Sequence, residues 1–124
     1  MLLTSYGAAR TVTGSRHAIE PQSARGRPGR KVLLDCGLVQ GRRQDANAAN
    51  KDLGFGPTEI GAVILSHAHI DHAGALPLLV KTGFQGTIFA TPATRDLCSV
   101  MLRDSAYIQK QDAEYLNRRA KREG

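Results

Sequence analysis

The pattern of hydrophobic and polar positions divides the chain into short apolar runs separated by glycine-rich and basic segments. Residues 2–6 and 16–20 predict two short strands near the amino terminus. Residues 31–35 (KVLLD) and 62–66 (AVILS) are almost continuously apolar, a pattern typical of strands buried on both faces. Residues 87–90 predict a further strand. The hydrophobic runs are therefore too short for long strands and fit a small sheet.

Helical patterns lie between and after these strands. Residues 43–53 and 74–81 predict two short helices. Thr91 is a favourable helix cap, and Pro92 suits the first helical position, where its missing N–H costs nothing. Apolar residues then recur at roughly helical spacing, which predicts a long helix to about Arg119. Strands that alternate with helices indicate an α/β or layered α+β fold.

Length and composition limit the class of protein. The chain has 124 residues, of which 41% are hydrophobic and 23% charged, values that suit one small globular domain. Aromatic residues make up only 5%, so the core must be built from Leu, Val, Ile and Ala. No apolar run approaches the roughly 20 residues of a membrane span. Residues 1–7 lack a basic leader and a cleavage site, so we expect no signal peptide.

The charge and the cysteines add two further expectations. The net charge is +6, with basic residues gathered at 25–31, 42–43 and 118–122. Such a surface attracts polyanions such as RNA, although clustered charge is more often a solvated face. The first cluster lies in a Gly/Pro/Arg loop predicted at residues 21–30. Cys36 and Cys98 have no metal-site spacing, and we expect two buried thiols in a reducing cytoplasm.

The segment with the clearest chemistry is 66–72 (SHAHIDH), which holds three of the four histidines. In an extended segment residues i and i+2 share a side, so His67 and His69 can converge on one metal ion. Asp71 and His72 then face the same space from the start of the next helix and can hold a second ion. Imidazole and carboxylate ligands suit zinc, and also Mn or Fe. The alternative is a polar turn without a metal, which would leave imidazoles unsatisfied.

Two other residues are weighed against simpler explanations. Asp35 follows an apolar strand, where a carboxylate can orient a ligand histidine through its second ring nitrogen. Its alternative is an Asx-type turn at a strand end, and the nearby metal motif favours the orienting role. His17 alternates with its strand neighbours and is more often a satisfied sheet histidine than a ligand, so we leave it out of the site.

Several segments together resemble a known family. The motif at 66–74 after an apolar strand resembles the signature of the metallo-β-lactamase superfamily. Residues 6–15 (YGAARTVTGS) look like the opening of its β-CASP branch, which includes RNA-processing nucleases. Residues 33–37 (LLDCG) look like the first motif of that branch, and 107–119 are similar to the long helix of bacterial members. The resemblance covers nearly the whole chain.

The resemblance implies a fold, a site and a reaction. The fold would be the amino-terminal part of an αβ/βα sandwich. His67 and His69 would bind one zinc, and Asp71 and His72 the second. Asp35 would brace the ligands, and we count Asp71 and Asp35 as the catalytic carboxylates. Two ions with a bridging hydroxide would hydrolyse the phosphodiester bonds of RNA.

The chain departs from the family pattern after His72. Family members supply a third histidine, a bridging aspartate and an inserted β-CASP domain further along, whereas no histidine follows His72 here. We therefore expect residues 1–124 to be a partial metallo-β-lactamase domain that holds about half of a two-metal site. The fragment itself is expected to be inactive, with activity in its full-length parent.

Two other functions remain open. A hydrolase of the same fold that acts on a small ester, thioester or lactam would use the same histidine motif. A truncated chain could also be a catalytically inert structural module, with apolar strand faces exposed. The partners that we expect are RNA and the missing remainder of the same domain, with assembly of further copies left open. We expect no membrane partner and a cytoplasmic location.

Overall fold

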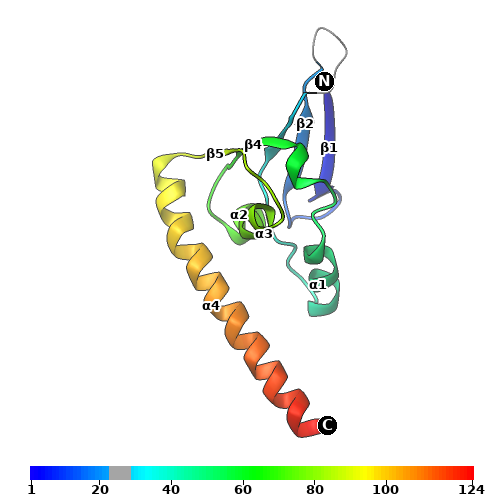
Figure 1. Ribbon diagram of the computed structural model, residues 1–124, viewed down its shortest axis with the longest axis vertical. Helices are drawn as coiled ribbons and strands as arrows, with labels where there is room; N and C mark the ends of the chain where they lie inside the picture. The colour runs from blue at the N-terminus through cyan, green and yellow to red at the C-terminus, as the bar shows by residue number, and fades with distance from the viewer. Residues whose placement is uncertain (23–28) are drawn as a thin grey trace.

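The computed structural model describes residues 1–22 and 29–124 and shows one mixed sheet with helices beside it (Figure 1). Most of the predicted loop at 21–30, with much of its basic cluster, lies outside the described residues. The described elements, in chain order, are β1 (Leu2–Gly7), β2 (Arg16–Glu20), β3 (Lys31–Leu34), α1 (Arg43–Lys51), a 3-10 turn (Pro57–Glu59), β4 (Ile60–Ile64), α2 (Ile70–Ala73), α3 (Leu76–Lys81), β5 (Thr87–Phe89) and α4 (Pro92–Glu123).

The five strands of the sheet follow their order in the chain, β1-β2-β3-β4-β5. The pairs β1–β2 and β2–β3 are antiparallel, whereas β3–β4 and β4–β5 are parallel. Parallel neighbours end at the same edge of a sheet, and such an edge is the usual place for α/β active sites. The segments after β3 and β4, which hold Asp35 and the histidine motif, therefore begin side by side.

The core lies on one face of the sheet. Leu33 of β3 and Val63 of β4 are fully buried, together with Leu79 of α3. The prediction of burial on both faces is wrong for β4, because Ile64 is 48% exposed, and on the same face of β3 Val32 and Leu34 are only partly buried. Successive residues of a strand point to opposite faces, so the side chain of Ile64 lies opposite that of Val63.

The long helix α4 begins as predicted and runs further. Thr91 accepts a hydrogen bond from the backbone N–H of Thr94 through its hydroxyl, and Pro92 opens the helix. The helix continues to Glu123, beyond the expected end near Arg119, and its carboxyl end points away from the sheet (Figure 1). Cys98 is its one buried residue, and Met101 and Leu102 pack partly buried against the core. The apolar residues further along the helix, Ile108, Tyr115 and Leu116, are exposed.

The element boundaries differ from the predicted ones at the site. β3 stops at Leu34, because Asp35 has a left-handed backbone (φ +59°) that cannot continue a strand. β4 ends at Ile64, so the last two residues of the predicted strand 62–66 lie outside it. The predicted helix 74–81 is α3, which starts two residues later and follows the single turn α2. The histidine motif thus lies on a loop and a short turn.

The cysteines and the hydropathy of the helices can be compared with the composition. Cys36 and Cys98 are free and buried, as predicted. Among residues 1–22 and 29–124, no helix combines the length and apolar content that a membrane crossing requires.

Candidate metal centre

Three loops meet at the carboxyl ends of β3 and β4 and are joined through their backbones. The N–H of Cys36 donates to the carbonyl oxygen of His72 at 2.8 Å, and the N–H of Ser15 donates to that of Asp71 at 2.8 Å. Gly37 packs so closely that an added Cβ would lie 1.6 Å from the Asp71 carbonyl oxygen. A glycine is therefore required here by space. These contacts hold the histidine motif in one place relative to β2 and β3.

The carboxylate of Asp35 is the centre of the polar network. Oδ1 accepts from the backbone N–H of Ser66 at 2.8 Å. Oδ2 accepts from the Ser66 hydroxyl at 2.9 Å, from Nδ1 of His72 at 2.8 Å and from the Ser15 hydroxyl at 3.4 Å. Burial alone would raise the pKa of Asp35, but the hydrogen bonds from His72 and Ser66 outweigh it and lower that pKa. The carboxyl group is therefore held ionised.

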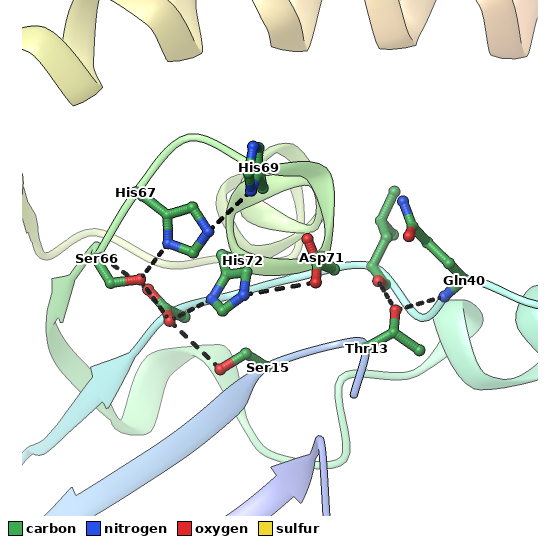
Figure 2. A network of polar contacts seen from close by, with 10 residues as sticks. Thr13, Ser15, Gln40, Ser66, His67, His69, Asp71 and His72 are labelled. Carbon is green, nitrogen blue, oxygen red and sulfur yellow. Dashed lines mark hydrogen bonds and ion pairs between the residues drawn. The ribbon is translucent and has the colours of Figure 1, made fainter. Parts of the chain in front are cut away.

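The four motif residues form two pairs of candidate metal ligands, which we call donor pairs: His67 with His69, and Asp71 with His72 (Figure 2). Nε2 of His67 lies 3.1 Å from Nδ1 of His69, and Nε2 of His72 lies 3.5 Å from Oδ2 of Asp71. The rings of His67 and His72 are 4.0 Å apart between centroids, so the two pairs are adjacent. Two ligands of one tetrahedral zinc ion at about 2.0–2.1 Å are separated by roughly 3.3–3.4 Å. Both pairs therefore suit the donor spacing of a bound divalent ion.

Each pair provides only two ligands. Within residues 1–22 and 29–124, no group of three or more His, Cys, Asp or Glu side chains is arranged to hold a metal ion. Structural zinc sites use four protein ligands, and catalytic ones usually three. The imidazole and carboxylate groups fit a divalent ion, but each pair supplies only part of the ligands that a zinc site needs. We call each pair a half-site.

The structure brings together all five residues predicted for the site. Asp35 contacts His72 directly and is linked to His67 through Ser66. His17 lies on β2 and pairs with the exposed Ser5, at 2.9 Å between Nδ1 and Oγ. His17 is therefore hydrogen-bonded within the sheet and lies outside the site.

Sequence reasoning missed Arg16, a buried residue that supports the site. Only 2% of Arg16 is exposed, and its Nε donates to the carbonyl oxygen of Gly37 at 2.9 Å. Its other nitrogens donate to Asn50 Oδ1 at 3.1 Å and to the carbonyl oxygen of Asp52 at 3.2 Å. Asn50 also pairs with both backbone groups of Val39. No sequence signal separates this buried arginine from the exposed ones.

Sequence reasoning also missed Ser66 and Ser15, the hydroxyl donors to Asp35. Ser66 is the first residue of the 66–72 motif, and this position beside His67 could have indicated that its hydroxyl lies at the site. Ser15 comes from a loop far from the motif in sequence, and only the folded arrangement reveals its contact.

Comparison with known proteins defines the class. Residues 24–89 match the family described as the metallo-beta-lactamase superfamily, which is more than half of the chain. The chain belongs to the metallo-β-lactamase superfamily, and membership implies the use of a divalent metal.

Three relatives narrow the assignment to the β-CASP branch. The chain is 42% identical over 111 residues to Ribonuclease TTHA0252 of Thermus thermophilus, covering 90% of this chain and 24% of that protein. It is 38% identical over 78 residues to Transcription termination factor FttA of Methanosarcina mazei, covering 62% of this chain and 12% of that protein. It is 38% identical over 89 residues to Cleavage and polyadenylation specificity factor 73 of Drosophila melanogaster, covering 71% of this chain and 13% of that protein. The chain thus spans about a quarter or less of these relatives, and the resemblance to RNA-processing nucleases is confirmed.

Proposed function

We propose that this chain is the amino-terminal part of a metal-dependent RNA phosphodiesterase. The observation that carries the proposal is the pairing of His67 with His69 and of Asp71 with His72, each at the donor spacing of one ion. The name of the Thermus relative, a ribonuclease, supports RNA as the substrate. The net charge of +6 favours attraction of a polyanion.

We propose zinc as the ion, bound by His67 and His69 in one half-site and by Asp71 and His72 in the other. Imidazole and carboxylate donors at this spacing support that choice, and Mn or Fe would use the same groups. A bound divalent ion supplies a Lewis acid, which stabilises the charge that develops on an attacked phosphate. The further ligands that complete the coordination would come from outside residues 1–124.

The protein groups contribute positioning in this proposal. Asp35 accepts from Nδ1 of His72, so the ring is oriented with Nε2 toward Asp71. The same carboxylate holds the Ser66 backbone at the start of the motif. Asp35 thereby acts on the ligands and does not need to touch the substrate. Two free, buried cysteines support a reducing, cytoplasmic location.

The test compares this chain with the longer protein encoded when the reading frame is followed past Gly124. We expect chelator-sensitive cleavage of RNA by the longer protein at low salt, and loss of that cleavage in its His67→Ala form. We expect none from residues 1–124. Robust RNA cleavage by the purified 124-residue chain would refute the assignment of this chain as an incomplete site.

A second substrate assay separates the proposal from its alternative. The longer protein is given a small ester, a thioester and a lactam under the same conditions. Hydrolysis of these compounds without cleavage of RNA would overturn the RNA assignment and favour a small-molecule hydrolase. Cleavage of RNA alone supports the proposal.

A further inference from the structure

The Ser66 hydroxyl connects the carboxylate of Asp35 to the imidazole of His67. Its Oγ lies 2.9 Å from Oδ2 of Asp35 and 2.9 Å from Nδ1 of His67. Figure 2 shows the Ser66 side chain beside the His67 ring, on the side away from His69. The Ser66 hydroxyl oxygen thus contacts two groups. The Asp35 carboxylate can only accept a hydrogen bond, whereas Nδ1 of His67 can donate or accept, depending on the tautomer of the ring.

Counting protons fixes the direction of both hydrogen bonds. A serine hydroxyl has one proton to donate, and an ionised carboxylate can only accept. The proton of Ser66 therefore goes to Asp35, and its Oγ is left to accept from His67. It follows that Nδ1 of His67 carries the hydrogen, so Nε2 has the free lone pair.

We propose that Ser66 is a positioning residue that holds His67 in the Nδ1–H tautomer. In that tautomer the lone pair of Nε2 faces Nδ1 of His69, 3.1 Å away. Asp35 performs the equivalent task for His72 directly, through Nδ1 at 2.8 Å. One carboxylate therefore orients one imidazole in each donor pair. The consequence for zinc rests on the proposed function, whereas the tautomer itself does not.

The chain offers a matched serine–histidine pair outside the site. The Ser5 hydroxyl lies 2.9 Å from Nδ1 of His17, the same separation as between Ser66 and His67. In the described part of the chain, no carboxylate takes the proton of Ser5, so this hydroxyl is free to donate or accept. Ser5→Ala is therefore a control that removes a serine–histidine contact without touching Asp35.

The first measurement is a long-range ¹H–¹⁵N NMR spectrum of the metal-free 124-residue protein, which distinguishes the two imidazole tautomers. We expect His67 to be Nδ1–H in the wild type and to move toward Nε2–H, which a free histidine side chain favours, in Ser66→Ala. Ser66→Thr keeps the hydroxyl and should restore the wild-type signal, and Ser5→Ala should leave it unchanged. Ser66 is exposed and its backbone N–H still reaches Asp35 in every variant, so the fold is preserved.

The second measurement is zinc affinity by titration calorimetry on the same proteins. Removing a partner of a metal-ligating histidine typically weakens binding about 10–100-fold, the loss that we expect for Ser66→Ala but not for Ser66→Thr or Ser5→Ala. A wild-type His67 in the Nε2–H form, or equal zinc affinity in Ser66→Ala and wild type, would overturn the proposal. If no variant binds zinc while the tautomers behave as expected, zinc binding by the two half-sites alone fails and the role of Ser66 in setting the tautomer stands.

Discussion

Nδ1 of His72 lies 2.8 Å from Oδ2 of Asp35, although 37 positions separate the two residues in the chain. The contact exists because β3 and β4 are parallel neighbours whose ends meet at one edge of the sheet. Asp35 adopts a left-handed backbone to reach it, a conformation that costs energy for most residues and less for aspartate or asparagine. The carboxylate recovers this cost through its hydrogen bonds to Ser66, Ser15 and His72.

Replacing Asp35 with asparagine tests how much depends on the carboxylate. Asparagine tolerates the left-handed backbone, but its amide nitrogen cannot accept a hydrogen bond from His72 or Ser66. We expect Asp35→Asn to lower the free energy of unfolding by about 1–3 kcal/mol, measured by urea denaturation. Asp45→Asn, on the exposed face of α1, is the control and should change it by less than about 0.5 kcal/mol. Equal effects at the two positions would contradict the central role of Asp35.

The buried guanidinium of Arg16 gives a second prediction. Arg16→Met keeps the length of the side chain but leaves the carbonyl oxygen of Gly37 without its donor. We expect a loss of about 2–4 kcal/mol in the free energy of unfolding, because a buried acceptor is left unpaired beside a broken network. Arg103→Met, at an exposed position of α4, is the matched control and should be nearly neutral. A neutral Arg16→Met would show that the loop after β3 holds its shape unaided.

The thiol of Cys36 predicts a dependence of stability on alkaline pH. Burial raises the pKa of Cys36 from 9.0 to about 12, with smaller contributions from Arg16, which lowers it, and Asp35, which raises it. Between these values the folded state keeps a proton that the unfolded state has lost, so stability falls as the pH rises above about 9. We expect the urea midpoint to fall between pH 8 and pH 10.5.

Cys36→Ala isolates this contribution from that of other groups that titrate in the same range. Its starting stability is lower because a buried side chain is shortened, but its midpoint should fall less steeply with pH than that of the wild type. Identical slopes for the two proteins would show that Cys36 does not carry the alkaline dependence.

Much of the site could be predicted because its donors are close together in sequence. His67, His69, Asp71 and His72 lie in one motif, and the i, i+2 relationship in an extended segment suffices to pair the first two. The start of α4 was equally local, since Thr91 and Pro92 act on their own helix. Features of this kind depend on neighbours in the chain, which a sequence displays directly.

The remaining features depend on contacts between distant segments. Arg16 looks like any basic residue until β2 is placed beside the loop that contains Gly37. The exposure of Ile64 depends on which elements cover each face of the sheet, and an apolar run does not show that. The same applies to Ser15, whose hydroxyl reaches Asp35 only in the folded protein.

The two donor pairs predict that zinc binding depends on the histidines of the 66–72 motif and not on a histidine elsewhere in the chain. Zinc should raise the melting temperature of the 124-residue protein, because a ligand that binds only the folded state stabilises it. His69→Ala removes one ligand of the first pair, and we expect its zinc-dependent shift to be reduced. His17→Ala removes a histidine that pairs with Ser5 outside the site, and its shift should match that of the wild type. A reduction of equal size in both variants would mean that zinc binds nonspecifically to imidazole groups, and the two-pair site would have to be abandoned.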